Sequence, residues 1–441
     1  MPAGGQFDVG GFDIAVEHRG RAAVQIAEGI TQLPDPVQHL IFGQKFALAP
    51  GLVDDLPQIQ PLDEIHDQIF PALIGEIIAD FGQIGMIEAG ENAGFLKKLL
   101  SIGVDLILIG HAQGQHLFDG GHLTHGWKLS VTGRFFNIVP YHVKDNGYID
   151  LKAVKELAQK HKPRLMWVGA TAYTREFPFK ELGKIADSVG AYLVADIAHI
   201  AGLVAAGVHT SPVPYVDIIT TTTHKTLRGP RGGMIMVTEH GLKKDPELAT
   251  KIDKAIMPGS QGGPHNHTTA AIAVALKEAN TPAFRKYAKQ IVVNANALAE
   301  ALKKHGVKLV SNGTDNHLML MKVGKARGAI VEVALDAVGM TANKNTIPGE
   351  PSSPFYPSGI RLGTPSITTR GMKVREMKKI AKWIAQTLEV VKNEELPKGK
   401  KAKEAYLKQL VVELPKNTII KKIRKEVRDV CRAFPAEDKF V

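Results

Sequence analysis

Residues 216–226 have the sequence VDIITTTTHKT, in which apolar and β-branched residues run almost to Lys225. Valine, isoleucine and threonine favour extended backbone. We therefore predict a β-strand over Val216–Thr221, with Lys225 just beyond its carboxyl end. This position puts a primary amine where open α/β sheets bind their ligands.

Short β-rich runs alternate with longer amphipathic stretches from Gly120 onward. This alternation predicts βαβ units and an α/β fold with a mainly parallel sheet. Because parallel strands share one carboxyl edge, residues that follow different strands should lie close together there. The other predicted elements are strands over Arg164–Val168 and Ala191–Ala195, the second ending at Asp196, and a helix over Phe179–Val189.

The residues beyond Pro264 predict a second, smaller α+β domain. A long helical region is expected to run through Thr281 to about His305. We place a large domain over residues 120–276 and a small C-terminal domain over residues 277–441. Within the small domain we expect strands over Val307–Val310 and Asn316–Val323, and helices over Ile330–Val338 and Val374–Val391.

The first 119 residues differ in composition from the rest of the chain. They contain 16 Asp and Glu against 5 Lys and Arg, a formal charge of −11, so the other residues carry +22 to give the total of +11. They hold no Tyr, Trp or Cys and a single serine, Ser101. Two interpretations stay open, a small independent domain and a foreign or mistranslated segment.

Composition argues against several classes of protein. The longest apolar stretches fall far short of the roughly 20 residues that cross a bilayer, and no secretory signal or transit peptide is recognised, so a cytoplasmic protein is expected. The single cysteine, Cys431, cannot form an internal disulfide, and no Cys/His cluster has zinc spacing, so no metal is expected. Lysine-rich stretches at 398–408 and 421–425 are expected to be solvated, and no RNA-binding motif accompanies them, so no nucleic-acid partner is expected.

Lys225 and Asp196 form a pair suited to a carbonyl cofactor. As a lone feature Lys225 would be a surface residue, but at a buried strand end its amine is partly desolvated, which lowers its pKa and favours Schiff-base chemistry. Asp196 follows an apolar strand, where a carboxylate needs a cation such as a protonated pyridine nitrogen. The alternative for Asp196 is a helix N-cap before Ala198. The pair points to pyridoxal 5'-phosphate.

Six stretches of sequence carry a resemblance to a known family. They occur in that family's order between residues 120 and 441, and matches of this length do not arise by chance. The family that they resemble is serine hydroxymethyltransferase. The stretches are GGHLTHG at 120–126, DIAHIAGLVAAG at 196–207, TTTTHKTLRGPRGG at 220–233, PGSQGGP at 258–264, GTDNH at 313–317 and SGIRLGTP at 358–365.

The resemblance implies a fold, a reaction and partners. The fold is expected to be that of the pyridoxal-phosphate transferases of fold type I, which is similar to aspartate aminotransferase. The implied reaction converts serine and tetrahydrofolate reversibly to glycine and 5,10-methylenetetrahydrofolate. Pyridoxal 5'-phosphate is then the cofactor and tetrahydrofolate the co-substrate, and the chain is expected to form a homodimer or tetramer.

The same resemblance implies roles at the cofactor. Lys225 is similar to the lysine that bonds the cofactor, and Asp196 to the partner of its pyridine nitrogen. His122 resembles the imidazole that stacks on the cofactor ring, and Thr171 resembles a hydroxyl near the phenolic oxygen. His199 resembles a histidine beside the ring. The remaining expected cofactor contacts are His224 and the glycines that reach the phosphate of the neighbouring subunit, Gly262 and Gly263.

Further residues are implied to hold the two substrates. Arg361, inside SGIRLGTP, resembles the guanidinium that receives the substrate carboxylate, a group suited to a planar bidentate donor. The alternative for Arg361 is a surface arginine. The expected folate contacts are Gly121, His122, Leu123, Asn345, Ser353, Pro354 and Phe355, with Leu117 as a further candidate.

One part of the family's pattern is missing from the sequence. The family's amino-terminal third supplies an arm, a tyrosine pair, a glutamate and a phosphate-binding loop, none of which is found in residues 1–119. Our hypothesis is that foreign sequence replaces the arm and impairs turnover. Two alternatives follow, a non-catalytic remnant or interaction protein and a folate-independent aldolase that cleaves 3-hydroxy amino acids. The folate-side matches favour the hydroxymethyltransferase over the aldolase.

Overall fold

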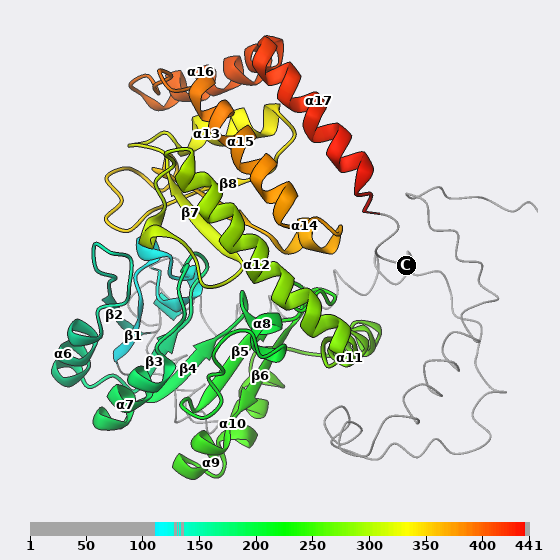
Figure 1. Cartoon of the computed structure of the whole chain (residues 1–441). Helices are drawn as coiled ribbons and strands as arrows, with labels where there is room; N and C mark the ends of the chain where they lie inside the picture. Colours follow the sequence, from blue (N-terminus) through cyan, green and yellow to red (C-terminus); the bar gives the residue numbers. More distant parts are fainter. Residues whose placement is uncertain (1–110, 128–129, 131, 134–135, 437–441) are drawn as a thin grey trace, which may run out of the picture. The chain divides into compact units, whose positions relative to one another are not determined.

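Two β-sheets form the framework of the described chain (Figure 1). The computed structural model describes residues 111–127, 130, 132–133 and 136–436. All of them belong to one unit, Gly103–Val441. The hypotheses on residues 1–119 therefore concern a segment that lies, up to residue 110, outside the described residues.

The larger sheet has six strands in the order β2-β1-β3-β4-β5-β6. The strands β1 to β5 pair in parallel, and β6 pairs antiparallel to β5. The prediction of an α/β fold with a mainly parallel sheet is confirmed. The strands are β1 (His111–Gln115), β2 (Asn137–Tyr141), β3 (Leu165–Val168), β4 (Tyr192–Asp196), β5 (Ile218–Thr222) and β6 (Gly233–Val237).

Helix α7 (Phe179–Val189) packs on β3 and β4 and has the predicted bounds. Its buried residues Phe179, Leu182 and Ile185 recur at helical spacing. Gly190 ends the helix with a φ of 72°, a left-handed conformation that glycine adopts without strain. The other helices of this part are α6 (Leu151–His161), α8 (Ala201–Ala205), α9 (Glu239–Lys244) and α10 (Leu248–Ile256).

The long helical region expected after Pro264 is two helices, α11 (Asn266–Ala279) and α12 (Pro282–Lys304). Thr281 separates them because its hydroxyl caps α12, accepting a hydrogen bond from the Phe284 N–H at 3.2 Å, and proline follows at the first helical position. α12 then runs from one hydrophobic core to another (Figure 1). It contributes Phe284, Ala288 and Ile291 to the first core and Ala295, Leu298, Ala299 and Leu302 to the second.

The second core surrounds a three-stranded antiparallel sheet in the order β7-β9-β8. This arrangement of strands and helices is of the α+β kind, whereas the division into two domains at residues 276 and 277 stays a prediction. The elements are β7 (Leu318–Lys322), β8 (Asn343–Asn345), β9 (Gly359–Gly363), α13 (Gly328–Ala337), α14 (Pro365–Thr369), α15 (Val374–Val390), α16 (Lys400–Glu413) and α17 (Thr418–Ala433).

The strand expected over Val307–Val310 does not form. Leu309 makes only an isolated bridge, and the 3-10 helix η4 (Val310–Asn312) follows at once. Ser311 has a φ of 53°, which ends extended backbone. The Ser311 hydroxyl lies 2.6 Å from that of Thr174, so a tie to the larger core outweighs the local β-propensity of the valines.

None of the helices among the described residues combines the length and the apolar character needed to cross a membrane.

The short helix α8 packs closely against the loop that carries Lys225. A Cβ placed on Gly202 would lie 2.3 Å from the backbone oxygen of Thr226. The Gly202 N–H also donates to the Thr226 hydroxyl at 3.0 Å, so the helix after β4 and the loop after β5 are joined directly.

We expect Gly202→Ala to lower the free energy of unfolding by about 1 to 3 kcal/mol, because two backbone segments must separate to admit the methyl group. Urea unfolding followed by circular dichroism measures this change. Gly233→Ala is the matched control, since its Cβ would meet Thr221 O at an ordinary 3.4 Å. Equal stability of the two variants would contradict the tight contact.

Candidate active site

Asp196 and Lys225 lie at the carboxyl edge of the larger sheet, as the sequence predicts. Asp196 is the last residue of β4 and pairs with Thr220 in β5. β5 ends at Thr222, and the chain turns so that His224 and Lys225 follow directly. The parallel register of the two strands therefore brings the carboxylate and the amine to the same edge.

Asp196 uses its two carboxylate oxygens differently. Oδ1 accepts a hydrogen bond from the Ala198 N–H at 3.0 Å, the local cap that the sequence offered as an alternative. Oδ2 lies 2.9 Å from His125 Nε2. Burial alone would raise the pKa of Asp196, but the hydrogen bond and charge of His125 together with the Ala198 N–H hold it below its ordinary value. The carboxylate therefore stays ionised and could also serve a cation.

His125 is a site residue that the sequence did not single out. Its ring is buried and stacks on Trp167, with centroids 4.9 Å apart and an interplanar angle of 13°. The stacking fixes Nε2 against Asp196, 71 positions away in sequence. The motif GGHLTHG contains two histidines, His122 and His125. Only the folded structure shows that His125 contacts the carboxylate of Asp196.

Lys225 has the electrostatic setting of a nucleophilic amine. Burial lowers its pKa, and the positive charges of Arg361 and Arg231 lower it further, while the nearby charge of Asp196 opposes them. The net pKa lies below the ordinary value for lysine. A lowered pKa increases the neutral fraction of the amine, which is the form that attacks carbonyl carbon.

A cavity of about 710 Å³ opens beside Lys225. It lies between residues of the larger sheet's carboxyl edge and residues of the smaller sheet, and none of its lining residues is acidic. The set is therefore suited to an anionic ligand. The residues that matter for its chemistry are His199, His224, Lys225, Arg228, His317 and Arg361.

Arg361 is held in a fixed orientation at this cavity. Its Nε donates to Asn343 Oδ1 at 3.1 Å, and its Nη1 donates to the backbone oxygen of Thr171 at 2.9 Å. Nη2 has no hydrogen-bond partner among the described residues. The surface-arginine alternative does not hold, because burial is deep enough to lower the pKa of this guanidinium. Thr171 thus meets the site through its backbone, and Asn343 is a positioning residue that the sequence did not indicate.

His199 and His317 form a neutral pair of imidazoles. Their ring centroids lie 5.7 Å apart and the rings are stacked. Burial, followed by the charges of neighbouring cationic groups, lowers the pKa of His199 to about 2 and that of His317 to about 3. His317 belongs to the quoted stretch GTDNH, but the sequence gave it no role of its own.

Comparison with known proteins agrees with this arrangement. The family model described as serine hydroxymethyltransferase matches residues 105–384. A serine hydroxymethyltransferase of Sorangium cellulosum (strain So ce56) is 50% identical over 326 residues, which are 73% of this chain and 70% of that protein. One of Dichelobacter nodosus (strain VCS1703A) is 45% identical over 346 residues, 78% of this chain and 75% of that protein. The chain belongs to the serine hydroxymethyltransferase family.

The match to the serine hydroxymethyltransferase family begins ahead of residue 120, where the sequence had placed its start. The structure has the same feature, since β1 (His111–Gln115) pairs with β2 and β3 inside the larger sheet. The family match and β1 therefore both begin ahead of residue 120, whereas the division into domains stays a prediction. The strand reads HAQGQ and lacks β-branched residues, so pairing on both sides, not propensity, makes it a strand.

The family motif GGHLTHG forms a tight turn beside Asp196. A Cβ on Gly121 would lie 2.1 Å from the Gln115 oxygen, so this position requires glycine. His122 Nδ1 lies 2.7 Å from the Thr124 hydroxyl, and its ring lies 5.5 Å from that of His125. Burial and the charge of His125 lower the pKa of His122. Leu123, an expected folate contact, is exposed.

Several expected serine hydroxymethyltransferase site residues do not line the large cavity. Gly262 and Gly263 are exposed, and an added Cβ at either would meet no atom within 4 Å. Asn345 lies in β8, where its side chain donates to the Thr346 oxygen at 2.8 Å. Leu117 lies in the 3-10 helix η2 (Leu117–Asp119). The last group, Ser353, Pro354 and Phe355, is exposed, and Phe355 lines a separate cavity of about 350 Å³.

Lowering the pH should lower the free energy of unfolding, because the buried His317 stays neutral in the folded chain. Above about pH 6.5 the histidine is neutral in both states, whereas below it the unfolded chain binds a proton that the folded chain refuses until about pH 3. The free energy of unfolding should therefore fall by about 1.4 kcal/mol per pH unit from this residue within that window. Urea unfolding at several pH values, compared between the parent chain and His317→Gln, measures the slope.

His305→Gln is the control for this slope, because His305 lies on the exposed end of α12. The free energy of unfolding of His317→Gln should depend on pH less steeply than that of the parent chain, by the equivalent of about one bound proton. The pH dependence of His305→Gln should equal that of the parent chain. A parent-like slope in His317→Gln would show that the buried ring accepts a proton in the folded chain.

Proposed function

We propose that this chain catalyses the reversible conversion of serine and tetrahydrofolate to glycine and 5,10-methylenetetrahydrofolate at the cavity beside Lys225. Members of the serine hydroxymethyltransferase family depend on pyridoxal 5'-phosphate and use tetrahydrofolate as co-substrate. The observation that carries the proposal is the meeting of the low-pKa amine of Lys225 with Arg361 at one cavity that lacks acidic lining.

The lining of the cavity fits pyridoxal 5'-phosphate, an anion with an aromatic ring and an aldehyde. It contains two arginines, one lysine and three histidines. Two buried nitrogens, His224 Nδ1 and His317 Nδ1, have no hydrogen-bond partner among the described residues. Buried polar atoms of this kind are costly unless a ligand or water satisfies them. When bound, the cofactor withdraws electrons from the amino acid and so stabilises negative charge at its Cα.

We assign Lys225 to hold the cofactor through its amine, for which the lowered pKa is the support. Asp196 would face the ring nitrogen, because its carboxylate stays ionised and a fixed negative charge keeps that nitrogen protonated. His125 holds this carboxylate in place from the other side. His122 and His199 would lie against the cofactor, and the low pKa of His199 keeps that imidazole neutral.

We assign Arg361 to bind the carboxylate of the amino-acid substrate. Its two hydrogen bonds to Asn343 and Thr171 orient the guanidinium before a substrate arrives. The charge of Arg361 also lowers the pKa of Lys225, so one side chain contributes to binding and to the state of the amine. The absence of acidic residues from the cavity lining further favours the carboxylate of the substrate.

The finer assignments are part of the same proposal. They are the fold type I of pyridoxal-phosphate enzymes, the division into domains 120–276 and 277–441, a homodimer or tetramer, and a place in the cytoplasm. The exposure of Gly262 and Gly263 supports contact with a second subunit. The exposure of Leu123 and Phe355 likewise leaves them accessible to folate.

Borohydride reduction of the cofactor-saturated chain should fix the cofactor to Lys225, because reduction makes a lysine–aldehyde bond permanent. Mass spectrometry of the proteolysed chain identifies the modified peptide. Lys225→Gln should carry no such adduct, whereas Lys243→Gln, on an exposed position of α9, should carry it as the parent does. An unmodified Lys225 in the reduced parent chain would refute the assignment of this lysine.

The reaction itself is tested by exchange of the glycine α-proton with solvent, followed by NMR. Exchange that tetrahydrofolate stimulates supports the hydroxymethyltransferase. Folate-independent cleavage of a 3-hydroxy amino acid without this stimulation would indicate the aldolase, and cofactor binding without either activity would indicate the non-catalytic remnant. The last outcome would support the hypothesis that the segment 1–119 impairs turnover.

We expect Arg361→Lys to lower kcat/KM for serine by roughly 10- to 100-fold, mainly through KM, because an ammonium cannot keep its anchors and also bind a carboxylate at two points. Steady-state kinetics with varied serine measures this. Arg424→Lys, at an exposed position of α17, is the matched control and should leave both constants unchanged. A normal KM in Arg361→Lys would move the carboxylate site elsewhere.

A further inference from the structure

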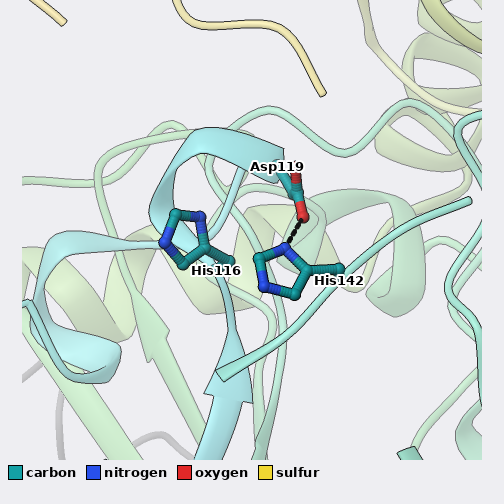
Figure 2. Close-up of side chains that lie close together, drawn as sticks. All are labelled: His116, Asp119 and His142. Carbon is teal, nitrogen blue, oxygen red and sulfur yellow. Dashed lines mark hydrogen bonds and ion pairs between the residues drawn. The ribbon is translucent and has the colours of Figure 1, made fainter. Parts of the chain in front are cut away.

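Three side chains from two segments, residues 116–119 and residue 142, meet at the carboxyl ends of β1 and β2 (Figure 2). The two strands pair in parallel with Gln115 opposite Tyr141, so the next residues, His116 and His142, leave the sheet side by side. The short helix η2 then carries Asp119 back toward them. Strand register therefore brings His142 to the pair of His116 and Asp119, which the short helix places together.

The three groups are close enough to share one ion. His142 Nδ1 lies 2.7 Å from Asp119 Oδ2, and the centroids of the two imidazole rings lie 4.7 Å apart. One ligand atom from each of the three residues lies within 4.8 Å of the others. Ligands of a tetrahedral zinc are separated by about 3.3 Å, as its bond lengths of about 2.0 to 2.1 Å require. Binding of an ion therefore requires the three ligand atoms to move closer together than in the structure without an ion.

The backbone of the cluster is fixed before any ion arrives. The His116 N–H donates to the Tyr141 oxygen at 2.9 Å, which continues the pairing of the strands. Asp119 is buried, and its Oδ2 also accepts the Val143 N–H at 3.3 Å. His142 in contrast keeps 59% of its side chain exposed. A held carboxylate and an accessible imidazole combine preorganisation with a path for a hydrated ion.

The ligand set selects a class of metal. Two imidazoles and one carboxylate suit divalent transition metals such as Zn²⁺, Co²⁺ and Ni²⁺, whereas Mg²⁺ and Ca²⁺ prefer oxygen ligands. Three protein ligands also leave one position open for water. We propose that His116, Asp119 and His142 form a binding site for one divalent transition-metal ion, separate from the cavity beside Lys225.

The proposal has a defined chemical cost. The His116 ring accepts a hydrogen bond from the Phe118 N–H at Nδ1, with a long N···N distance of 3.3 Å, and ligation through that nitrogen replaces this bond. The proton between His142 Nδ1 and Asp119 must also move to His142 Nε2, so that Nδ1 is free to bind the ion. A purely structural hydrogen bond between Asp119 and His142 would need neither change. It would also give His116 no part, and His116 is therefore the residue that separates the two interpretations.

A second set, His122, His125 and Asp196, gathers in the same way, but it belongs to the proposed cofactor site. The cofactor must therefore fill that second set during the metal-binding experiment, so that the added ion does not bind there. The metal test therefore uses the full, untagged chain saturated with pyridoxal 5'-phosphate and stripped of metal by a chelator. Co²⁺ is the probe, because its visible absorption reports nitrogen and oxygen ligands directly, and Zn²⁺ follows by competition.

We expect one equivalent of Co²⁺ to bind with new visible bands, and Zn²⁺ to displace it. His142→Ala and His116→Ala should each weaken binding by at least about tenfold. His305→Ala, which removes an exposed imidazole outside the cluster, is the matched control and should bind as the parent does. Asp119→Asn should also weaken binding. If this variant does not fold because Asp119 is buried, His142→Ala still tests the site, because the His142 ring is exposed.

Three results would overturn the site. One is a parent chain that takes up no more Co²⁺ than the double variant His116→Ala/His142→Ala. Another is Co²⁺ uptake that both single histidine variants leave unchanged, which would place the ion elsewhere. A loss in His142→Ala alone, with parent-like binding in His116→Ala, would equally reject the three-ligand site in favour of the structural hydrogen bond.

Discussion

Parallel pairing of β1 to β5 is the constraint on which the rest of the described structure depends. Parallel strands end at one edge, so every residue that follows a strand is delivered to the same side of the sheet. Asp196 and Lys225 meet there because β4 and β5 are neighbours. His116 and His142 meet there because β1 and β2 are neighbours. One rule of topology therefore accounts for two clusters with different chemistry.

The electrostatics of the cavity follow from the same crowding of one edge. Several groups that can carry positive charge converge without an acidic residue in the lining. Burial above all, and then the charge of Arg361, lowers the pKa of His199 to about 2 and that of His317 to about 3, and the pKa of Lys225 falls for the same reasons. Because the two histidines are neutral, the charged guanidinium of Arg361 meets less electrostatic repulsion. A bound anion would reverse this balance and stabilise the site.

The sequence predicted the part of the site that depends on local pattern. The strands of the larger sheet that end near Asp196 and Lys225 were found, whereas the strand expected over Val307–Val310 was wrong. Contacts between distant segments were not found, because the hydrogen bond from His125 to Asp196 and the one from Arg361 to Asn343 depend on burial and register, which no spacing rule reports. β1 was missed for the same reason, since its two neighbours, not its residues, make it a strand.

Helix α12 adds a mechanical condition to the site. Its first half packs in the core of the larger sheet and its second half in the core of the smaller one. Lys225 follows a strand of the first sheet, whereas Arg361 lies in β9 of the second. The distance between amine and guanidinium is therefore set by packing along one continuous helix and by the bond from Arg361 to Thr171. A loss of either support would separate the two groups without altering their chemistry, so substrate binding and the pKa of Lys225 should change together.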